Sequence, residues 1–282
     1  MTVRSIAVLG AGTMGHGVAH AAAASGFDTR LYDVSDAQAT KARGTIDGIL
    51  RKAVDLGKAT ALEADAAMAR LVTTSDVTAA LAGADLVIET APERMDIKMQ
   101  LFAAIDAHAP AGAVVASNTS ALSITEMAGM LKDPSRVAGM HFFKPVHKMK
   151  LIEIVRALES SEHALDTIEA VGRQMGKETV LVREAPGFIT TRVNASIGNE
   201  AFYMLMEGVA SARDIDKALK LGLNHPMGPF ELVDLVGLDT RLCILEYLHK
   251  SMGEKYRPCP LLSQYVKAGR LGKKVGKGVY DY

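Results

Sequence analysis

A histidine in the segment GMHFFKP, residues 139–145, and a glutamate farther along the same stretch are the first candidates for chemistry. We interpret HFFKPVHKMKLIEI as a β-hairpin whose connection is centred near His147. Because opposed residues of an antiparallel pair have a constant index sum, this hairpin puts Glu153 across from His141. An unpaired carboxylate inside the apolar run LIEIV would be costly. The spacing therefore predicts a general acid/base whose tautomer the acid holds. A buried ion pair that only locks the hairpin is the alternative.

A polar turn lies upstream of this histidine. The segment AVVASNTSALSI is a strand that runs into polar residues, and ligands of open α/β sheets collect beyond the carboxyl ends of strands. Helix capping is the alternative, but Ser123 with Glu126 already forms a capping box without these residues. We therefore expect four residues to meet a cofactor or a substrate: Ser117, Asn118, Thr119 and Ser120.

A glycine-rich loop follows the first expected strand. The segment IAVLGAGTMGHG has the G-x-G-x-x-G spacing between a strand and a helix. In such a loop the first glycine makes the turn, the second lets the backbone approach a pyrophosphate, and the third packs helix against strand. The expected cofactor-binding residues of the loop are Gly10, Ala11, Gly12, Thr13, Met14 and Gly15.

An acid at the end of the second expected strand predicts which dinucleotide binds. Asp33, in LYDVSD, is in position to accept hydrogen bonds from the ribose hydroxyls. Its charge would repel a 2′-phosphate, and no arginine follows it directly. The sequence therefore favours NAD over NADP.

Two patterns of periodicity divide the chain. The β-rich runs SIAVLG, DTRLYD, ADLVIET, AVVASN, RVAGMHFF, KLIEIV and ETVLV alternate with helical segments. This alternation predicts a Rossmann-type, doubly wound, mostly parallel α/β sheet. After EAPGF only helical spacing is left, with one apolar stripe from Ile189 to Leu205 and another from Leu232 to Tyr247. We expect an α/β domain over residues 1–185 and an all-α domain over residues 186–282.

Composition narrows the class of protein. Lys plus Arg and Asp plus Glu each number 32 among 282 residues, so no global field recruits nucleic acid or an anionic membrane. The first strand starts too close to the initiator methionine for a signal peptide, and no apolar run is long enough to span a bilayer. Cys243 and Cys259 fit no metal or redox spacing. We expect a cytoplasmic enzyme without a metal.

Several motifs together resemble a known family. GAGTMG, ERMDIK, SNTS, GMHFF, APGF, NHPMGP and the terminal GRLGKKVGKGVYDY follow one another as in short-chain L-3-hydroxyacyl-CoA dehydrogenases of the 3-hydroxybutyryl-CoA dehydrogenase type. The resemblance covers nearly the whole chain. It implies an NAD-binding N-terminal domain and a helical C-terminal domain that binds substrate and forms a homodimer. It also implies reversible oxidation of a 3-hydroxyacyl-CoA thioester to the 3-ketoacyl-CoA.

The resemblance also implies roles for single residues. His141 takes the hydroxyl proton, Glu153 orients it, and Ser120 hydrogen-bonds the reacting oxygen. Contacts with the nicotinamide nucleotide fall to Glu93 and Lys98 of ERMDIK and to Lys274 of GKKVG. Lysines after the second strand usually meet the CoA phosphates, so Lys52 and Lys58 are the candidates, with a solvated surface position as the alternative.

Two positions depart from the family pattern. The family usually has HFFNP, with an asparagine that contacts the cofactor, whereas this chain has Lys144. An asparagine that helps to hold the substrate oxygen commonly follows PGF, whereas this chain has Thr191. A threonine hydroxyl can donate one hydrogen bond, and Asn194 lies three residues on along the same side of a helix. Either residue is a candidate for that task.

Two other functions fit the same motifs. A dehydrogenase of a free hydroxy acid or a sugar acid can use this scaffold, because a fold does not fix the substrate. A dinucleotide-binding protein without catalysis is the second, although an intact set of His141, Glu153 and Ser120 argues against it.

Overall fold

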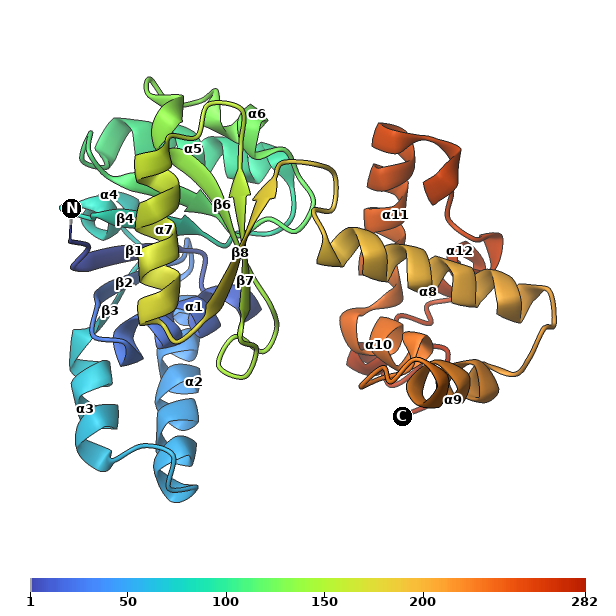
Figure 1. Cartoon of the computed structure of the whole chain (residues 1–282). Helices are drawn as coiled ribbons and strands as arrows, with labels where there is room; N and C mark the ends of the chain where they lie inside the picture. Colours follow the sequence, from blue (N-terminus) through green and yellow to red (C-terminus); the bar gives the residue numbers. More distant parts are fainter. Residues whose placement is uncertain (1) are drawn as a thin grey trace. The chain divides into compact units, whose positions relative to one another are not determined.

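The computed structural model describes residues 2–282, which divide into two compact units, one ending at Glu184 and one running from Ala185 to Tyr282. The first unit is coloured blue to yellow in Figure 1 and contains one sheet. Its strands are β1 (Ser5–Leu9), β2 (Asp28–Tyr32), β3 (Leu71–Thr74), β4 (Leu86–Glu89), β5 (Val114–Ser117), β6 (Val137–Phe142), β7 (Leu151–Arg156) and β8 (Glu178–Arg183).

The strand order confirms the expected Rossmann-type sheet. The order is β3-β2-β1-β4-β5-β6-β7-β8, and all neighbours are parallel except β6 and β7. Central strands such as β4 are buried along their whole length, as expected for parallel strands covered on both faces. All seven expected strands are present. The eighth, β3, is the short edge run LVTT, which has too few apolar residues to stand out in the sequence.

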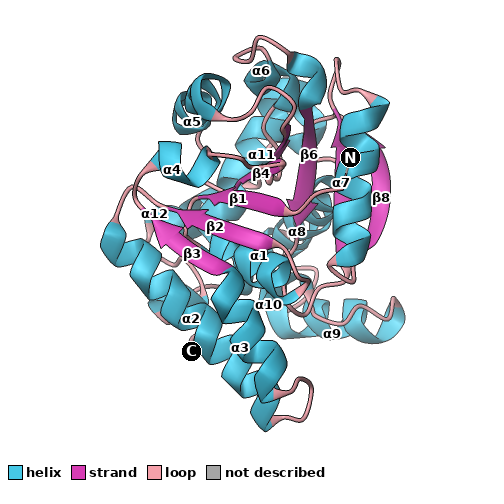
Figure 2. Ribbon diagram, turned by 90° about the vertical axis from the view of Figure 1, so that its left-hand side faces the viewer, coloured by secondary structure: helices cyan, strands magenta, loops and turns pink. Residues whose placement is uncertain are grey.

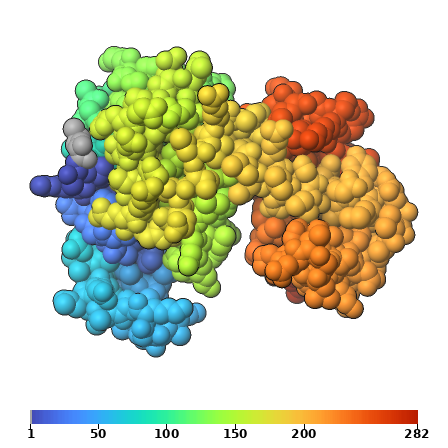
Figure 3. Space-filling model, viewed as in Figure 1, coloured from blue at the N-terminus to red at the C-terminus, as the bar shows by residue number. Residues whose placement is uncertain are grey.

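Helices cover both faces of this sheet (Figure 2). Buried side chains of α1 and α7 form one cluster with alternate residues of the strands, whereas α4, α5 and α6 lie on the other side. The helices α2 and α3 form a pair that projects as a lobe of the first unit (Figure 3). The helices are α1 (Thr13–Ala24), α2 (Asp36–Asp55), α3 (Ala61–Arg70), α4 (Val77–Leu81), α5 (Met95–His108), α6 (Ile124–Ala128) and α7 (Glu162–Gln174).

The turn between β1 and α1 is closely packed. Gly10 has a φ of 107°, and its backbone oxygen accepts a hydrogen bond of 2.8 Å from the hydroxyl of Thr90. A methyl group at Gly15 would lie 1.7 Å from that same oxygen, so only a glycine lets the helix approach the strand. At Gly12 a methyl group would have no neighbour within 4 Å. The two glycines therefore serve different purposes, one for packing and the other for access to the loop.

The second unit is helical, as expected, with the helices α8 (Thr190–Met206), α9 (Ala212–Gly222), α10 (Pro229–Val236), α11 (Leu238–Met252) and α12 (Pro260–Lys267). One expectation is wrong: the stripe from Leu232 to Tyr247 does not lie on one helix. Gly237, with a φ of 112°, ends α10 and starts α11, and Leu235 and Val236 before it are partly exposed. None of the helices within residues 2–282 has the length and apolar character that a bilayer span needs.

The stripe from Ile189 to Leu205 does follow one helix, α8, but its start faces outward. Ile189 and Val193 are about half exposed, whereas Ala201 is fully buried. The core of the unit is instead built around the ring pair of Phe202 and Phe230, whose centroids are 5.2 Å apart. The first turns of α8 therefore present apolar surface that this unit does not bury.

The connection between β6 and β7 packs against α1 and brings two histidines and a lysine close together. His20 of α1 faces His147 of the connection, with ring centroids 6.1 Å apart, and Lys177 donates hydrogen bonds to two backbone oxygens of the connection. Burial lowers the pKa of His20 to about 4, and the neighbouring His147, Lys177 and His16 lower it further. His20 is therefore neutral near pH 7.

We expect the two glycine positions to respond differently to alanine. Gly15→Ala should lower the free energy of unfolding by about 1–3 kcal/mol, because its methyl group overlaps a backbone oxygen that cannot move alone. Gly12→Ala should leave thermal stability near that of the native protein. Melting curves of the three proteins without nucleotide test this expectation, and equal midpoints for Gly15→Ala and the native chain would contradict it.

Acid should destabilise the fold through His20. Its pKa is about 4 in the folded state and near the ordinary 6.5 in the unfolded chain, so between these values only the unfolded chain takes up the proton. The free energy of unfolding should therefore fall by about 2–3 kcal/mol as the pH drops through this window. Urea titrations at pH 7 and pH 4 should show a smaller drop for His20→Gln than for His163→Gln, an exposed control. Equal drops would refute the assignment.

Candidate active site

The histidine and glutamate singled out in the sequence form a close pair. In the antiparallel register of β6 and β7, His141 lies opposite Glu153, as the index sum predicted. The Nδ1 of His141 is 2.8 Å from Oε2 of Glu153, and the two residues are 4% and 0% exposed. An ionised carboxylate only accepts hydrogen bonds, so Nδ1 carries the proton that it donates to Glu153. The tautomer that results leaves Nε2 as the basic nitrogen.

The polar turn after β5 is tied to the strand that bears this histidine. The amide of Phe142, next to His141, donates a 2.9 Å hydrogen bond to Oδ1 of Asn118. Asn118 is itself fixed, because its backbone amide donates to the carbonyl oxygen of Glu89. The turn and the histidine are thus held by neighbouring strands at the carboxyl edge of the sheet.

Of the four polar residues expected to meet a ligand, three are engaged within the protein. The hydroxyl of Ser117 donates to Glu89, Asn118 holds β6, and the hydroxyl of Thr119 donates to Glu93 at 2.7 Å. All three are buried. The hydroxyl of Ser120 is different, because no hydrogen bond to it is found within residues 2–282. Ser120 is therefore the member of the turn that is available to a ligand.

A buried ion pair lies beneath this turn, and sequence analysis missed one of its members. Glu89 is the last residue of β4. Nζ of Lys98 donates hydrogen bonds to its Oε1 at 2.7 Å and to its Oε2 at 2.9 Å. The two side chains are 0% and 1% exposed. Lys98 also reaches the backbone oxygen of Ala91 at 3.3 Å. The argument that singled out Glu153, a carboxylate within an apolar strand, applies equally to Glu89 in ADLVIET.

The glycine loop has the features that a dinucleotide requires. The first turn of α1 has no side-chain cap and no acidic residue, so its amide groups are open to a phosphate. Asp33 lies beside the loop, with Oδ2 accepting a 2.9 Å hydrogen bond from the amide of Ala11 and Oδ1 one of 3.1 Å from Ser35. The open space at Gly12 leaves room for a pyrophosphate. The residues fit NAD.

Other expected site residues lie elsewhere in the two units. Lys144 is exposed in the connection after β6, and Lys52 and Lys58 are exposed at the far end of α2 and in the turn that follows it. In the second unit, Thr191 and Asn194 occupy the first turns of α8 and are partly buried.

Lys274 also belongs to the second unit, where its Nζ donates to both carboxylate oxygens of Asp239, at 2.7 Å and 2.6 Å. Residues 2–282 contain no group of three or more His, Cys, Asp or Glu side chains that would hold a metal ion.

Comparison with known proteins places the chain in a family. The model of the 3-hydroxyacyl-CoA dehydrogenase NAD binding domain matches residues 5–185, and that of the 3-hydroxyacyl-CoA dehydrogenase C-terminal domain matches residues 187–282. A probable 3-hydroxybutyryl-CoA dehydrogenase of Bacillus subtilis (strain 168) is 45% identical, over 100% of this chain and 98% of its own length. The 3-hydroxybutyryl-CoA dehydrogenase of Bradyrhizobium diazoefficiens is 41% identical, over 99% and 96%.

A solved structure agrees with these relatives. The crystal structure of (S)-3-hydroxybutyryl-CoA dehydrogenase from Ralstonia eutropha superimposes with a TM-score of 0.96 at 40% identity, covering 100% of this chain and 99% of that one. The match extends over both units. By its sequence and its fold, the chain belongs to the 3-hydroxyacyl-CoA dehydrogenase family.

Proposed function

We propose that the protein is an NAD-dependent dehydrogenase that interconverts (S)-3-hydroxyacyl-CoA and 3-ketoacyl-CoA. The names of its relatives support short acyl chains, with 3-hydroxybutyryl-CoA and acetoacetyl-CoA as the pair of substrates. The observation that carries the proposal is the buried His141–Glu153 pair at the same sheet edge as the glycine loop and Ser120.

The cofactor of the proposed reaction is NAD. Gly10 to Gly15 and the uncapped start of α1 would hold the pyrophosphate, and Asp33 would accept hydrogen bonds from the ribose. The carboxylate of Asp33 would also repel the 2′-phosphate of NADP. When bound, NAD supplies the acceptor for the hydride that leaves C3 of the hydroxyacyl group.

His141 is the proposed acid and base. Its Nδ1 proton is committed to Glu153, so Nε2 takes the proton of the C3 hydroxyl during oxidation and returns it to the C3 oxygen during reduction. Glu153 also stabilises the imidazolium that forms. The hydroxyl of Ser120 donates a hydrogen bond to the same oxygen, which polarises the ketone. Oxidation of the alcohol by NAD releases one proton overall, so high pH should favour oxidation over reduction.

The second unit and the connecting segments supply the further proposed contacts. Thr191 or Asn194 of α8 donates a hydrogen bond to the substrate oxygen, and Lys274 contacts the nicotinamide nucleotide, as does Lys144. Glu93 is proposed for the same nucleotide. The burial of Lys98 and the use of its ammonium group by Glu89 favour a supporting role for this lysine.

The CoA moiety is proposed to meet Lys52 or Lys58. Both are exposed in the lobe formed by α2 and α3, and neither has an ion pair within the described residues, 2–282. An exposed lysine suits a phosphate group because its ammonium is a compact positive charge on a flexible stem.

The assembly is proposed to be a homodimer formed through the second unit. Large apolar side chains are left exposed there, among them Ile189, Val193, Met206, Val209 and Leu223. Balanced charge supports the absence of a nucleic acid or membrane partner. A cytoplasmic location and a place in fatty acid metabolism complete the proposal.

The histidine assignment predicts the effect of His141→Asn. Turnover of acetoacetyl-CoA with NADH should fall by about 10²–10⁴-fold, because the general acid is lost, while NADH affinity stays within about twofold. His147→Asn, in the same hairpin, is the matched control and should keep native turnover. Steady-state rates and NADH fluorescence titrations give both quantities. Near-native turnover in His141→Asn would remove His141 from the mechanism.

The substrate assignment predicts the outcome of a comparison between thioester and free acid. NADH oxidation should be fast with acetoacetyl-CoA and slow with acetoacetate, and NADPH should replace NADH poorly because of Asp33. CoA thioesters of increasing length would then define the preferred acyl chain. Equal rates with acetoacetyl-CoA and acetoacetate would favour a dehydrogenase of free hydroxy acids, and tight NADH binding without any turnover would favour a non-catalytic protein.

A further inference from the structure

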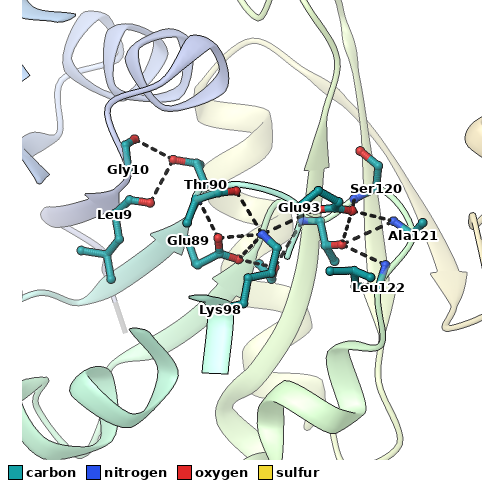
Figure 4. Close-up of polar contacts among 12 residues, drawn as sticks. Leu9, Gly10, Glu89, Thr90, Glu93, Lys98, Ser120, Ala121 and Leu122 are labelled. Carbon is teal, nitrogen blue, oxygen red and sulfur yellow. Dashed lines mark hydrogen bonds and ion pairs between the residues drawn. The ribbon is translucent and has the colours of Figure 1, made fainter. Parts of the chain in front are cut away.

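We propose that Glu89 is a positioning residue for the reaction, acting through Lys98 and Glu93 on the turn that carries Ser120. The inference rests on the proposed function, because Ser120 is taken to bind the reacting oxygen. Figure 4 shows the chain of contacts, which runs from the end of β4 to the backbone of that turn. Neither Glu89 nor Lys98 has a role in the proton transfer itself.

Glu89 is the fixed end of this chain. It is fully buried, and it lies opposite Ser117 in the parallel register of β4 and β5. Its Oε2 accepts a 2.6 Å hydrogen bond from the hydroxyl of Ser117, and its Oε1 accepts one of 2.6 Å from the amide of Ala91. These contacts leave the carboxylate one orientation. A carboxylate held so firmly on a rigid strand can define the position of the cation that it binds.

Lys98 is shared between two carboxylates. Its Nζ is 2.7 Å from Oε1 of Glu89 and 3.5 Å from Oε2 of Glu93. One positive charge thus lies between two carboxylates and attracts both. Lys98 is 1% exposed, whereas the side chain of Glu93 is 42% exposed. The buried lysine therefore holds Oε2 of Glu93, the carboxylate oxygen that the turn does not bind.

Glu93 in turn holds the backbone of the catalytic turn. Its Oε1 accepts three hydrogen bonds, from the hydroxyl of Thr119 at 2.7 Å and from the amides of Ser120 at 2.8 Å and Ala121 at 3.2 Å (Figure 4). The amide of Ser120 is thus fixed while its hydroxyl stays available. If Glu93 moves, the turn loses all three hydrogen bonds together. The orientation of the Ser120 hydroxyl therefore depends, through Glu93, on the charge of Lys98.

The proposal predicts a specific defect when the anchor is removed. In Glu89→Gln the full charge of Lys98 falls to Glu93 alone, which should draw that carboxylate away from the turn. Turnover of acetoacetyl-CoA should fall by about 10- to 100-fold, since small displacements at a reacting centre have effects of this size. Because Glu93 is also proposed to contact the nucleotide, the affinity for NADH should fall, but by less than turnover does. Hydrogen exchange at the amides of Ser120 and Ala121 should accelerate.

The double variant Glu89→Gln/Lys98→Met separates positioning from stability. It has no unpaired buried charge, so its melting temperature should recover relative to Glu89→Gln. The double variant lacks the ammonium group that holds Glu93, so its turnover and amide protection should both stay low. The single variant Lys98→Arg keeps the positive charge. It should therefore retain more turnover and more amide protection than the double variant. Asp96→Asn is the matched control, because Asp96 pairs with Arg94 in the same segment but at the exposed surface.

The outcomes are distinct. Recovery of turnover together with stability in the double variant would overturn the proposal, because the pair would then be structural only. A weaker affinity for NADH with protection of Ser120 unchanged would overturn it as well, in favour of a direct cofactor contact. Hydrogen exchange does not depend on activity: faster exchange in Glu89→Gln would support the positioning chain even if the native protein reduced no thioester, a result that would refute only the proposed function.

Discussion

The site depends on a single constraint, which is that a carboxylate inside a sheet must have a partner. Glu153 is fully buried in the middle of β7, and its Oε2 lies 2.8 Å from Nδ1 of His141 on the neighbouring strand. Removing either group would leave the other buried without its counterpart. The pair therefore stabilises the hairpin, fixes one tautomer of the imidazole and makes Nε2 basic at the same time. The burial of Glu153 therefore accounts both for the stability of the hairpin and for the tautomer of His141.

The same constraint recurs on β4, three strands from β7 in the sheet. Glu89 is a buried carboxylate at the end of β4, and its buried partner is Lys98. The two pairs are joined through the turn after β5, where Asn118 binds the amide of Phe142 and Glu93 binds the amide of Ser120. The carboxyl edge of the sheet thus has an ordered polar layer beside the hydroxyl of Ser120. Rigid strands carry Glu89, His141 and Glu153, which limits the motion of each.

Much of this could be predicted from the sequence, and the failures have physical reasons. The seven expected strands have apolar runs that are strong signals, whereas β3 is a four-residue edge. The facing of His141 and Glu153 followed from the arithmetic of a hairpin. The sequence did not predict which hydroxyls of SNTS turn inward. Their direction depends on Glu89 and Glu93, which lie more than twenty residues from the turn along the chain. Gly237 divided a helical stripe that periodicity alone presents as continuous.

The central claim is that a glutamate-held imidazole and a fixed serine hydroxyl meet one oxygen of the substrate. A crystal structure of the protein with NAD and acetoacetyl-CoA bound together tests it most directly. The account predicts that the C3 oxygen lies within hydrogen-bonding distance of both Nε2 of His141 and Oγ of Ser120, with the Nδ1 contact to Glu153 retained. A C3 oxygen bound by other groups, or an imidazole turned away from it, would contradict the account.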